Sequence, residues 1–235
     1  MKRFFSGEGG FFGFMDKVAG LFWINLLTMI CSIPVITAGA AVTACYYVTL
    51  KMVKNEEGYL TKSFFRSFRT NFRQSTLIWI LEAVLISVFV ADFWIIATGI
   101  AGEIPLSNVI LVVTGILLFI VLMTAAYVFP ILARYDNTTA NTIKNAVLMG
   151  IANFPKTLAI MVTNALFPAL GIAVIATGRG LWIVPILLCF GISAGIYLSS
   201  RILVRIFDAY GTDEVESEGI STDRKESDTE EIRVK

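Results

Sequence analysis

Long apolar runs constrain the fold of this chain more than any other feature of its sequence. Several of them reach the roughly 20 residues that an α-helix needs to cross the hydrocarbon core of a bilayer. Apolar residues make up 56% of the 235-residue chain, whereas about 45–50% is usual in soluble domains. The runs are apolar at odd and even positions alike, so they lack the alternation of a transmembrane β-barrel. The sequence predicts an all-α membrane protein that crosses the bilayer several times.

Prolines, glycines and polar turns divide the apolar runs into about six transmembrane helices. The predicted spans cover about residues 18–33, 37–53, 75–97, 109–129, 158–176 and 181–204. Pro34 closes the first span, because the residue before a proline is disfavoured in the helical conformation. The second span is rich in small residues, and Ala40 and Ala44 form a step that allows two helix backbones to approach closely. Both spans are short, so we expect a tight hairpin of the first two helices.

The polar ends of the chain flank this predicted membrane domain. Residues 1–17 are glycine-rich and contain several phenylalanines, which predicts a surface-associated cytoplasmic leader. Residues 18–208 form the six-helix membrane domain. Residues 209–235 contain few apolar residues and many charges, which predicts a disordered acidic cytoplasmic tail. Near the last span's end, Arg201, Arg205 and Asp208 are spaced for contact along one helix.

A basic amphipathic helix is predicted directly before the third span. At 100° per residue, four phenylalanines share one arc, and the basic residues Lys62, Arg66, Arg69 and Arg73 fall on the opposite side. Such a helix lies at a membrane surface, with arginines among lipid phosphates or against a partner protein. These four basic residues are therefore candidates for partner docking or for lipid contact, and both interpretations stay open.

A second polar loop, residues 134–157, also predicts an amphipathic cytoplasmic helix. Its Asn153-Phe154 pair, followed by two polar or basic positions and an apolar run, repeats Asn71-Phe72 after 82 residues. The match favours a parallel internal repeat of span, surface helix and span, as in some transporter folds. Chance similarity between two apolar segments would give the same match.

The distribution of basic residues predicts the orientation of the chain. With six spans and the N-terminus inside, eighteen of the nineteen lysines and arginines lie on the cytoplasmic side, and only Arg179 lies outside. A bias of this kind sets the topology of membrane proteins. Both termini are therefore predicted to be cytoplasmic.

Glu82 is a candidate polar site within the membrane. Ionisable residues at depth are costly there and are often functional. Glu82 lies about a third of the way into the third span, where Arg73 or Arg201 could reach it. A structural ion pair or hydrogen bond is one interpretation, and a proton or substrate site is the other. Asp92, near the outer surface, can reach the headgroups.

The sequence offers little for enzyme chemistry. It contains no histidine, so the commonest general base and metal ligand is missing. Cys31, Cys45 and Cys189 lie inside apolar runs and are expected to be small core residues. No phosphate-binding glycine-rich loop with a lysine is present. We therefore expect no catalytic residues, no cofactor, no metal site, no nucleic-acid partner and no enzymatic activity.

Three segments resemble the YesL family of small bacterial integral membrane proteins of unknown function. They read WINLLTMICSIPVITAGAAVTACYYVTLKMVKNEEG, SFFRSFRTNFRQSTLIWI and FPILARYDNTTANTIKNAVLMGIANFPKTL. The resemblance implies a multi-pass protein of the bacterial cytoplasmic membrane. It also implies a carbohydrate-utilisation context, because members are often encoded beside ABC-type sugar importers. Glu82 and the acidic tail do not match the family pattern.

Three functional hypotheses follow from these features. The leading one is a non-enzymatic accessory or permease-like component of carbohydrate uptake, whose cytoplasmic helices dock on ABC-transporter subunits. The second is a self-sufficient small-molecule permease with a polar path between the repeats. The third is a structural membrane interaction protein. The spans contain few polar residues beyond Asn25, Glu82 and Asn164, which favours docking over a permease.

Overall fold

The fold is a bundle of helices in the computed structural model, which describes residues 10–56, 58–98, 107–178 and 180–233. For residues 10–12, 107, 181 and 211–233 the backbone alone is described. These ranges contain helices and turns and no strand. The elements are α1 (Gly10–Ser32), η1 (Val35–Thr37), α2 (Ala38–Lys54), α3 (Leu60–Thr98), α4 (Ser107–Arg134), α5 (Thr139–Ala152), α6 (Phe154–Thr177), η2 (Leu181–Ile183) and α7 (Val184–Arg233).

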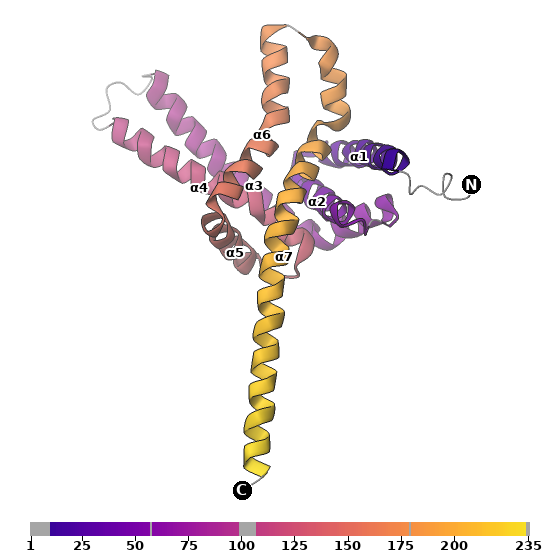
Figure 1. Ribbon diagram of the computed structural model, residues 1–235. Coiled ribbons are helices and arrows are strands. Elements are labelled where there is room, and N and C mark those ends of the chain that lie inside the picture. The colour runs from indigo at the N-terminus through magenta and orange to yellow at the C-terminus, as the bar shows by residue number, and fades with distance from the viewer. Residues whose placement is uncertain (1–9, 57, 99–106, 179, 234–235) are drawn as a thin grey trace, which may run out of the picture.

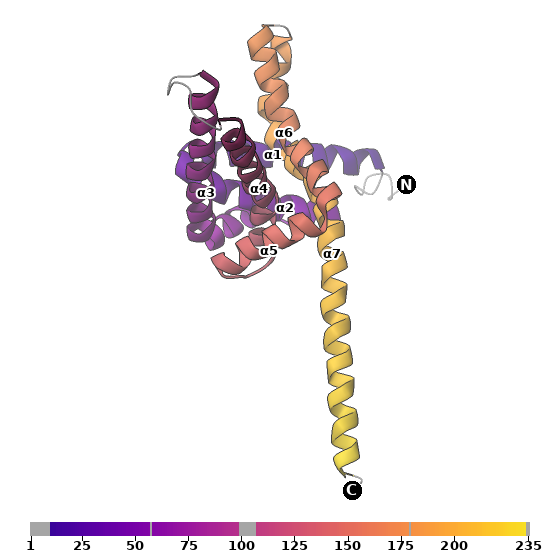
Figure 2. The same cartoon turned by 90° about the vertical axis from the view of Figure 1, so that its left-hand side faces the viewer.

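Two pairs of long helices diverge toward the same end of the molecule (Figures 1 and 2). One pair is α3 with α4, and the other is α6 with the first part of α7. The short helix α5 lies at the opposite end, where it packs against α4. The helices α1 and α2 pack against one another and against α7, so they complete the bundle.

Six of these helices, all but α5, are long and apolar enough to cross a membrane. Much of their apolar surface is exposed on the isolated chain. On α3 and α4, for example, Val84, Val88 and Ile116 are each at least half exposed. Apolar faces of this extent mark a surface that is covered by a membrane or a partner. The all-α, six-span class predicted from the sequence is confirmed, and the cytoplasmic orientation of both termini stays a prediction.

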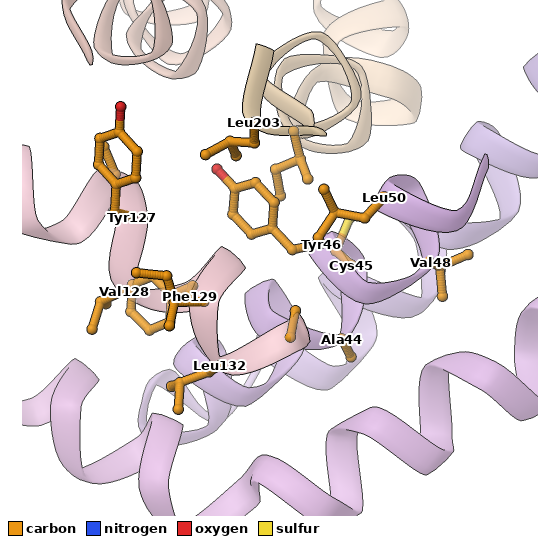
Figure 3. Close-up of a cluster of buried hydrophobic side chains, with 14 of the residues drawn as sticks. Ala44, Cys45, Tyr46, Val48, Leu50, Tyr127, Val128, Phe129, Leu132 and Leu203 are labelled. Carbon is orange, nitrogen blue, oxygen red and sulfur yellow. The ribbon is translucent and has the colours of Figure 1, made fainter. Parts of the chain in front are cut away.

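Helix α2 is the centre of the core. Most of its residues are buried, and α1, α3, α4 and α7 all pack against it. The buried cluster joins α2 to the last turns of α4 and to Leu203 of α7 (Figure 3). Its largest fully buried side chains include Tyr127, Phe64 and Phe207. The second span is therefore shielded from lipid, and α3, α4 and α6 supply most of the lipid-facing surface.

The helices α2 and α3 touch at Gly39. A Cβ atom at this position would lie 2.5 Å from Cβ of Trp79 and 2.6 Å from the carbonyl oxygen of Ser75. The indole Nε1–H of Trp79 also donates to the carbonyl oxygen of Val35 at 2.8 Å. The sequence predicted a close approach from Ala40 and Ala44, which are fully buried, and the structure adds the close approach at Gly39.

A single asparagine joins α1 to α7. The Nδ2 atom of Asn25 donates to the carbonyl oxygen of Leu188 at 2.7 Å, and its Oδ1 atom accepts from the backbone N–H of Ser193 at 3.1 Å. Both backbone groups belong to the same stretch of α7, and Asn25 is 1% exposed. Within a bilayer no water competes for these two hydrogen bonds, so Asn25 ties α1 to α7.

The sequence had predicted that the basic segment forms a surface helix separate from the third span. This prediction was wrong. The basic segment is continuous with the third span, and together they form the 39-residue helix α3. The stretch from Leu60 to Thr98 contains neither glycine nor proline, so nothing in its backbone chemistry ends the helix. In the second copy of the predicted repeat, the surface helix and the span are separate helices. Helix α5 ends at Ala152, and Pro155 lies in the first turn of α6.

The two copies of the predicted repeat agree at the start of their spans. The hydroxyl of Ser75 donates to the carbonyl oxygen of Asn71 at 2.6 Å, and the hydroxyl of Thr157 donates to that of Asn153 at 3.0 Å. Both hydroxyl residues are fully buried. These pairs are separated by the same 82 residues as the sequence match. Bonds of this kind also occur at other serines and threonines of the bundle, for example from Thr43 to Gly39, so the parallel repeat stays a prediction.

The backbone is helical in parts of both predicted terminal segments. Helix α7 continues to Arg233, whereas we had predicted disorder from residue 209. In Figure 1 this extension projects away from the bundle. Glutamates, lysine and arginine favour helix, and proline is absent, so the composition permits this backbone. Residues 1–9 of the predicted leader lie outside the described residues, and α1 already begins at Gly10.

Candidate functional site

The basic helix face consists of Lys62, Arg66, Arg69 and Arg73 on the first half of α3. All four side chains are exposed. On the opposite side Phe64 is fully buried and belongs to the hydrophobic core. The ring of Phe68 stacks on that of Phe64, with the ring centroids 6.3 Å apart. The phenylalanine side of α3 therefore packs on the bundle, which holds the basic helix face outward.

The basic helix face has no carboxylate partner among the residues that the structure describes. The ion pairs found there both involve Asp208 and lie elsewhere. The four positive charges are thus free to meet an anionic surface, either lipid phosphates or the carboxylates of another protein. Which of the two they meet stays a prediction.

Glu82 lies in the membrane-spanning half of α3 and is 6% exposed. Its Oε1 atom is buried and makes no hydrogen bond to any described residue. The ion pair that we considered with Arg73 or Arg201 is not formed, and both arginines are exposed. A carboxylate without a partner is costly at this depth. The role of Glu82, as a structural group or as a proton or substrate site, stays a prediction.

An ion cluster joins the ends of three spans. Asp208 of α7 accepts from Nζ of Lys54 on α2 at 2.7 Å and from a guanidinium nitrogen of Arg134 on α4 at 3.0 Å. The same guanidinium lies over the ring of Phe207, 5.3 Å from its centroid. The sequence had predicted contacts of Asp208 along its own helix. The carboxylate instead bridges to two other helices, because their basic ends converge on it.

A cavity lies between α2, α4, α6 and α7. It has a volume of about 430 Å³ and walls that are mostly apolar. Its polar part is a hydrogen-bonded network. Asn164 donates to the hydroxyl of Tyr46 at 3.2 Å and accepts from Ser199 at 2.7 Å, and Ser199 is 2.9 Å from the hydroxyl of Thr163.

This network was only partly visible in the sequence. Asn164 was recognised as a rare polar residue within a span. Tyr46 was not, because a tyrosine in an apolar run gives no sign of its partner 118 residues away. Among the described residues, no three Cys, Asp or Glu side chains are grouped so that they could hold a metal ion.

The fold and its exposed apolar helices define a multi-pass α-helical membrane protein. Residues 21–93 match the model of a family described as "Protein of unknown function, DUF624". The matched segment extends from α1 to the last turns of α3, so it includes the basic helix face and Glu82. Neither a curated protein nor a solved structure matches the chain.

Proposed function

We propose that the protein is a non-enzymatic accessory component of the bacterial cytoplasmic membrane that supports carbohydrate uptake by an ABC-type importer. In this proposal the basic helix face docks on a carboxylate-bearing surface of a transporter subunit. The observation that carries it is the outward, unpaired placement of Lys62, Arg66, Arg69 and Arg73 on a helix that Phe64 fixes to the core.

The continuity of α3 favours docking over a simple interfacial anchor. An anchor helix lies in the plane of the membrane surface. Helix α3 has 39 residues, which is about 58 Å at 1.5 Å per residue. The hydrocarbon core is only ~30 Å thick. The basic half of α3 therefore extends beyond the apolar layer and presents its arginines where a partner protein can reach them.

The carbohydrate context comes from the resemblance to the YesL family, and the positive-inside bias supports a cytoplasmic position for the basic helix face. The DUF624 match covers the first two of the three segments that carry this resemblance, and it gives no function of its own. A cytoplasmic position would place the arginines on the side of the membrane where importer ATPases bind.

The test replaces Arg66, Arg69 and Arg73 together by lysine. Lysine keeps the charge but cannot make the planar, bidentate contact of a guanidinium with a carboxylate. We expect normal membrane insertion and loss of importer subunits in copurification from native membranes. The matched control replaces Arg201 and Arg205, which are also exposed, by lysine. Unchanged copurification of the triple variant would leave lipid anchoring as the better account.

A second candidate function is a self-sufficient permease. The observation that favours it is the large cavity with Tyr46 and Asn164 in its wall. Replacement of Asn164 by leucine should then abolish solute uptake into proteoliposomes of the purified protein. Under the docking proposal the purified protein alone transports nothing, and this substitution leaves copurification intact.

A further inference from the structure

Two adjoining hollows lie beside the ion cluster, where the second and fourth spans end. One has a volume of about 270 Å³ and the other about 210 Å³. Tyr47, Ala133 and Arg134 line both, so the hollows meet along these residues. We refer to them together as the basic hollows.

Four bases and two acids line the basic hollows. The bases are Lys51, Lys54, Arg66 and Arg134, and the acids are Glu56 and Asp136. Asp208 neutralises part of this charge, because it pairs with both Lys54 and Arg134. Lys51 and Arg66 have no carboxylate partner among the described residues.

Lys51 and Arg66 approach the basic hollows from different helices. Nζ of Lys51, on α2, lies 4.4 Å from the centroid of the Tyr47 ring. Arg66, on α3, lines the smaller hollow together with Ser67 and Thr70. The ammonium group of Lys51, the guanidinium group of Arg66 and the hydroxyl groups of Ser67 and Thr70 are all hydrogen-bond donors. Donors of this kind suit a phosphate group.

The position of the basic hollows at the ends of the spans indicates that the phosphate group belongs to a lipid. Lys54 is the last residue of the second span and Arg134 is the last residue of the fourth. Bases at the ends of spans lie at the level of the lipid headgroups. Basic pockets between transmembrane helices at this level bind anionic headgroups. The apolar side chains of Leu50 and Leu132, which also line the hollows, lie toward the bundle core.

We propose that the basic hollows bind the phosphate of an anionic phospholipid, with Lys51 and Arg66 as its principal charged contacts. The site shares Arg66 with the basic helix face, but Lys51 is not part of that face, and Arg69 and Arg73 do not line the hollows. The lipid would bridge α2, α3 and α4 at the membrane surface.

The test measures phospholipid bound to the full-length protein in mild detergent by native mass spectrometry, with phosphatidylglycerol and phosphatidylcholine as probes. We expect wild-type protein to retain phosphatidylglycerol in preference to phosphatidylcholine. Each of Lys51→Gln and Arg66→Gln should weaken phosphatidylglycerol binding about fivefold, the effect of one base near the headgroups. The matched control is Arg69→Gln, which removes the same charge from the same helix and should leave binding unchanged.

Three results would overturn the proposal. The first is equal binding of the two lipids by the wild-type protein, a measurement that needs no variant. The second is unchanged phosphatidylglycerol binding in the Lys51→Gln, Arg66→Gln double variant. The third is protection from thermal unfolding by millimolar inorganic phosphate alone with no added effect of phosphatidylglycerol, which would assign the site to a soluble phosphate.

The Lys51→Gln variant separates this proposal from the docking function. It should bind phosphatidylglycerol about fivefold more weakly and still copurify with a partner, because the basic helix face is intact. Thermal unfolding without added lipid reports the folding of each variant. Lys51 is only partly buried and Arg66 is exposed, so their substitution leaves the core in place.

Discussion

Replacement of Gly39 by alanine tests the contact between α2 and α3. The added methyl group would lie 2.5 Å from Cβ of Trp79 and 2.6 Å from the carbonyl oxygen of Ser75. Ordinary contact begins at 3.4 Å, so the two helices must separate by roughly 0.9 Å. Neither neighbouring atom is the flexible end of a side chain, and the separation therefore involves the helix backbones.

The expected loss of stability has two parts. Overpacking of a tight contact typically costs about 1–3 kcal/mol. Separation of the helices also weakens the bond from Trp79 to Val35, and hydrogen bonds between membrane helices contribute about 0.6 kcal/mol and at most ~1.7. Alanine favours helix over glycine by about 0.5–1 kcal/mol, which offsets part of the loss. The net destabilisation should be about 1–3 kcal/mol, a fall in Tm of roughly 3–10 °C.

The assay is thermal unfolding of the detergent-solubilised protein, followed by circular dichroism at a helix wavelength. Gly115→Ala is the matched control, since Gly115 is also within a span but has no atom within 4 Å of the position that an added methyl group would occupy. It should be as stable as the wild type or slightly more stable. If Gly39→Ala unfolds at the same temperature as Gly115→Ala, the direct contact between α2 and α3 is refuted.

Three further predictions follow from the fold. In a background without the native cysteines, a cysteine that replaces Arg179 should react with an impermeant maleimide in intact cells. A cysteine that replaces the exposed Thr70 should not react. Labelling at position 70 from outside the cell would show that the topology is reversed. Asn25→Leu should destabilise the protein by about 1–3 kcal/mol in thermal unfolding, because it removes two hydrogen bonds between α1 and α7. Glu82→Gln should be at least as stable as the wild type, since Oε1 has no partner among the described residues, and a clear fall in Tm would reveal a structural bond of the carboxylate.

The sequence predicted those features that depend on local chemistry. The apolar runs and their turn residues located the six spans, and Pro34 correctly separated the first two. Helical periodicity correctly placed Phe64 and Arg66 on different sides of α3, since one is buried and the other exposed. A change from basic to apolar composition does not end a helix, and α3 is continuous because the stretch from Leu60 to Thr98 contains no glycine or proline.

Features that depend on distant residues were not predictable in this way. Asp208 has basic residues on its own helix, and only the convergence of α2 and α4 shows that Lys54 and Arg134 are its partners. Asn25 gave no sign that it bonds to α7, because its partners lie more than 160 positions along the chain. The basic hollows likewise exist only where three helices meet.

The unbroken backbone of α3 has a mechanical consequence. The helix is held to α2 near Ser75 and Trp79 by its contact with Gly39, and its basic end is held to the core by Phe64. Between Arg66 and Thr98 it contains no glycine or proline at which to bend, over about 48 Å at 1.5 Å per residue. A displacement of the basic end is therefore carried to the far end of the span by the helix backbone itself. The break between α5 and α6 removes this coupling from the second copy.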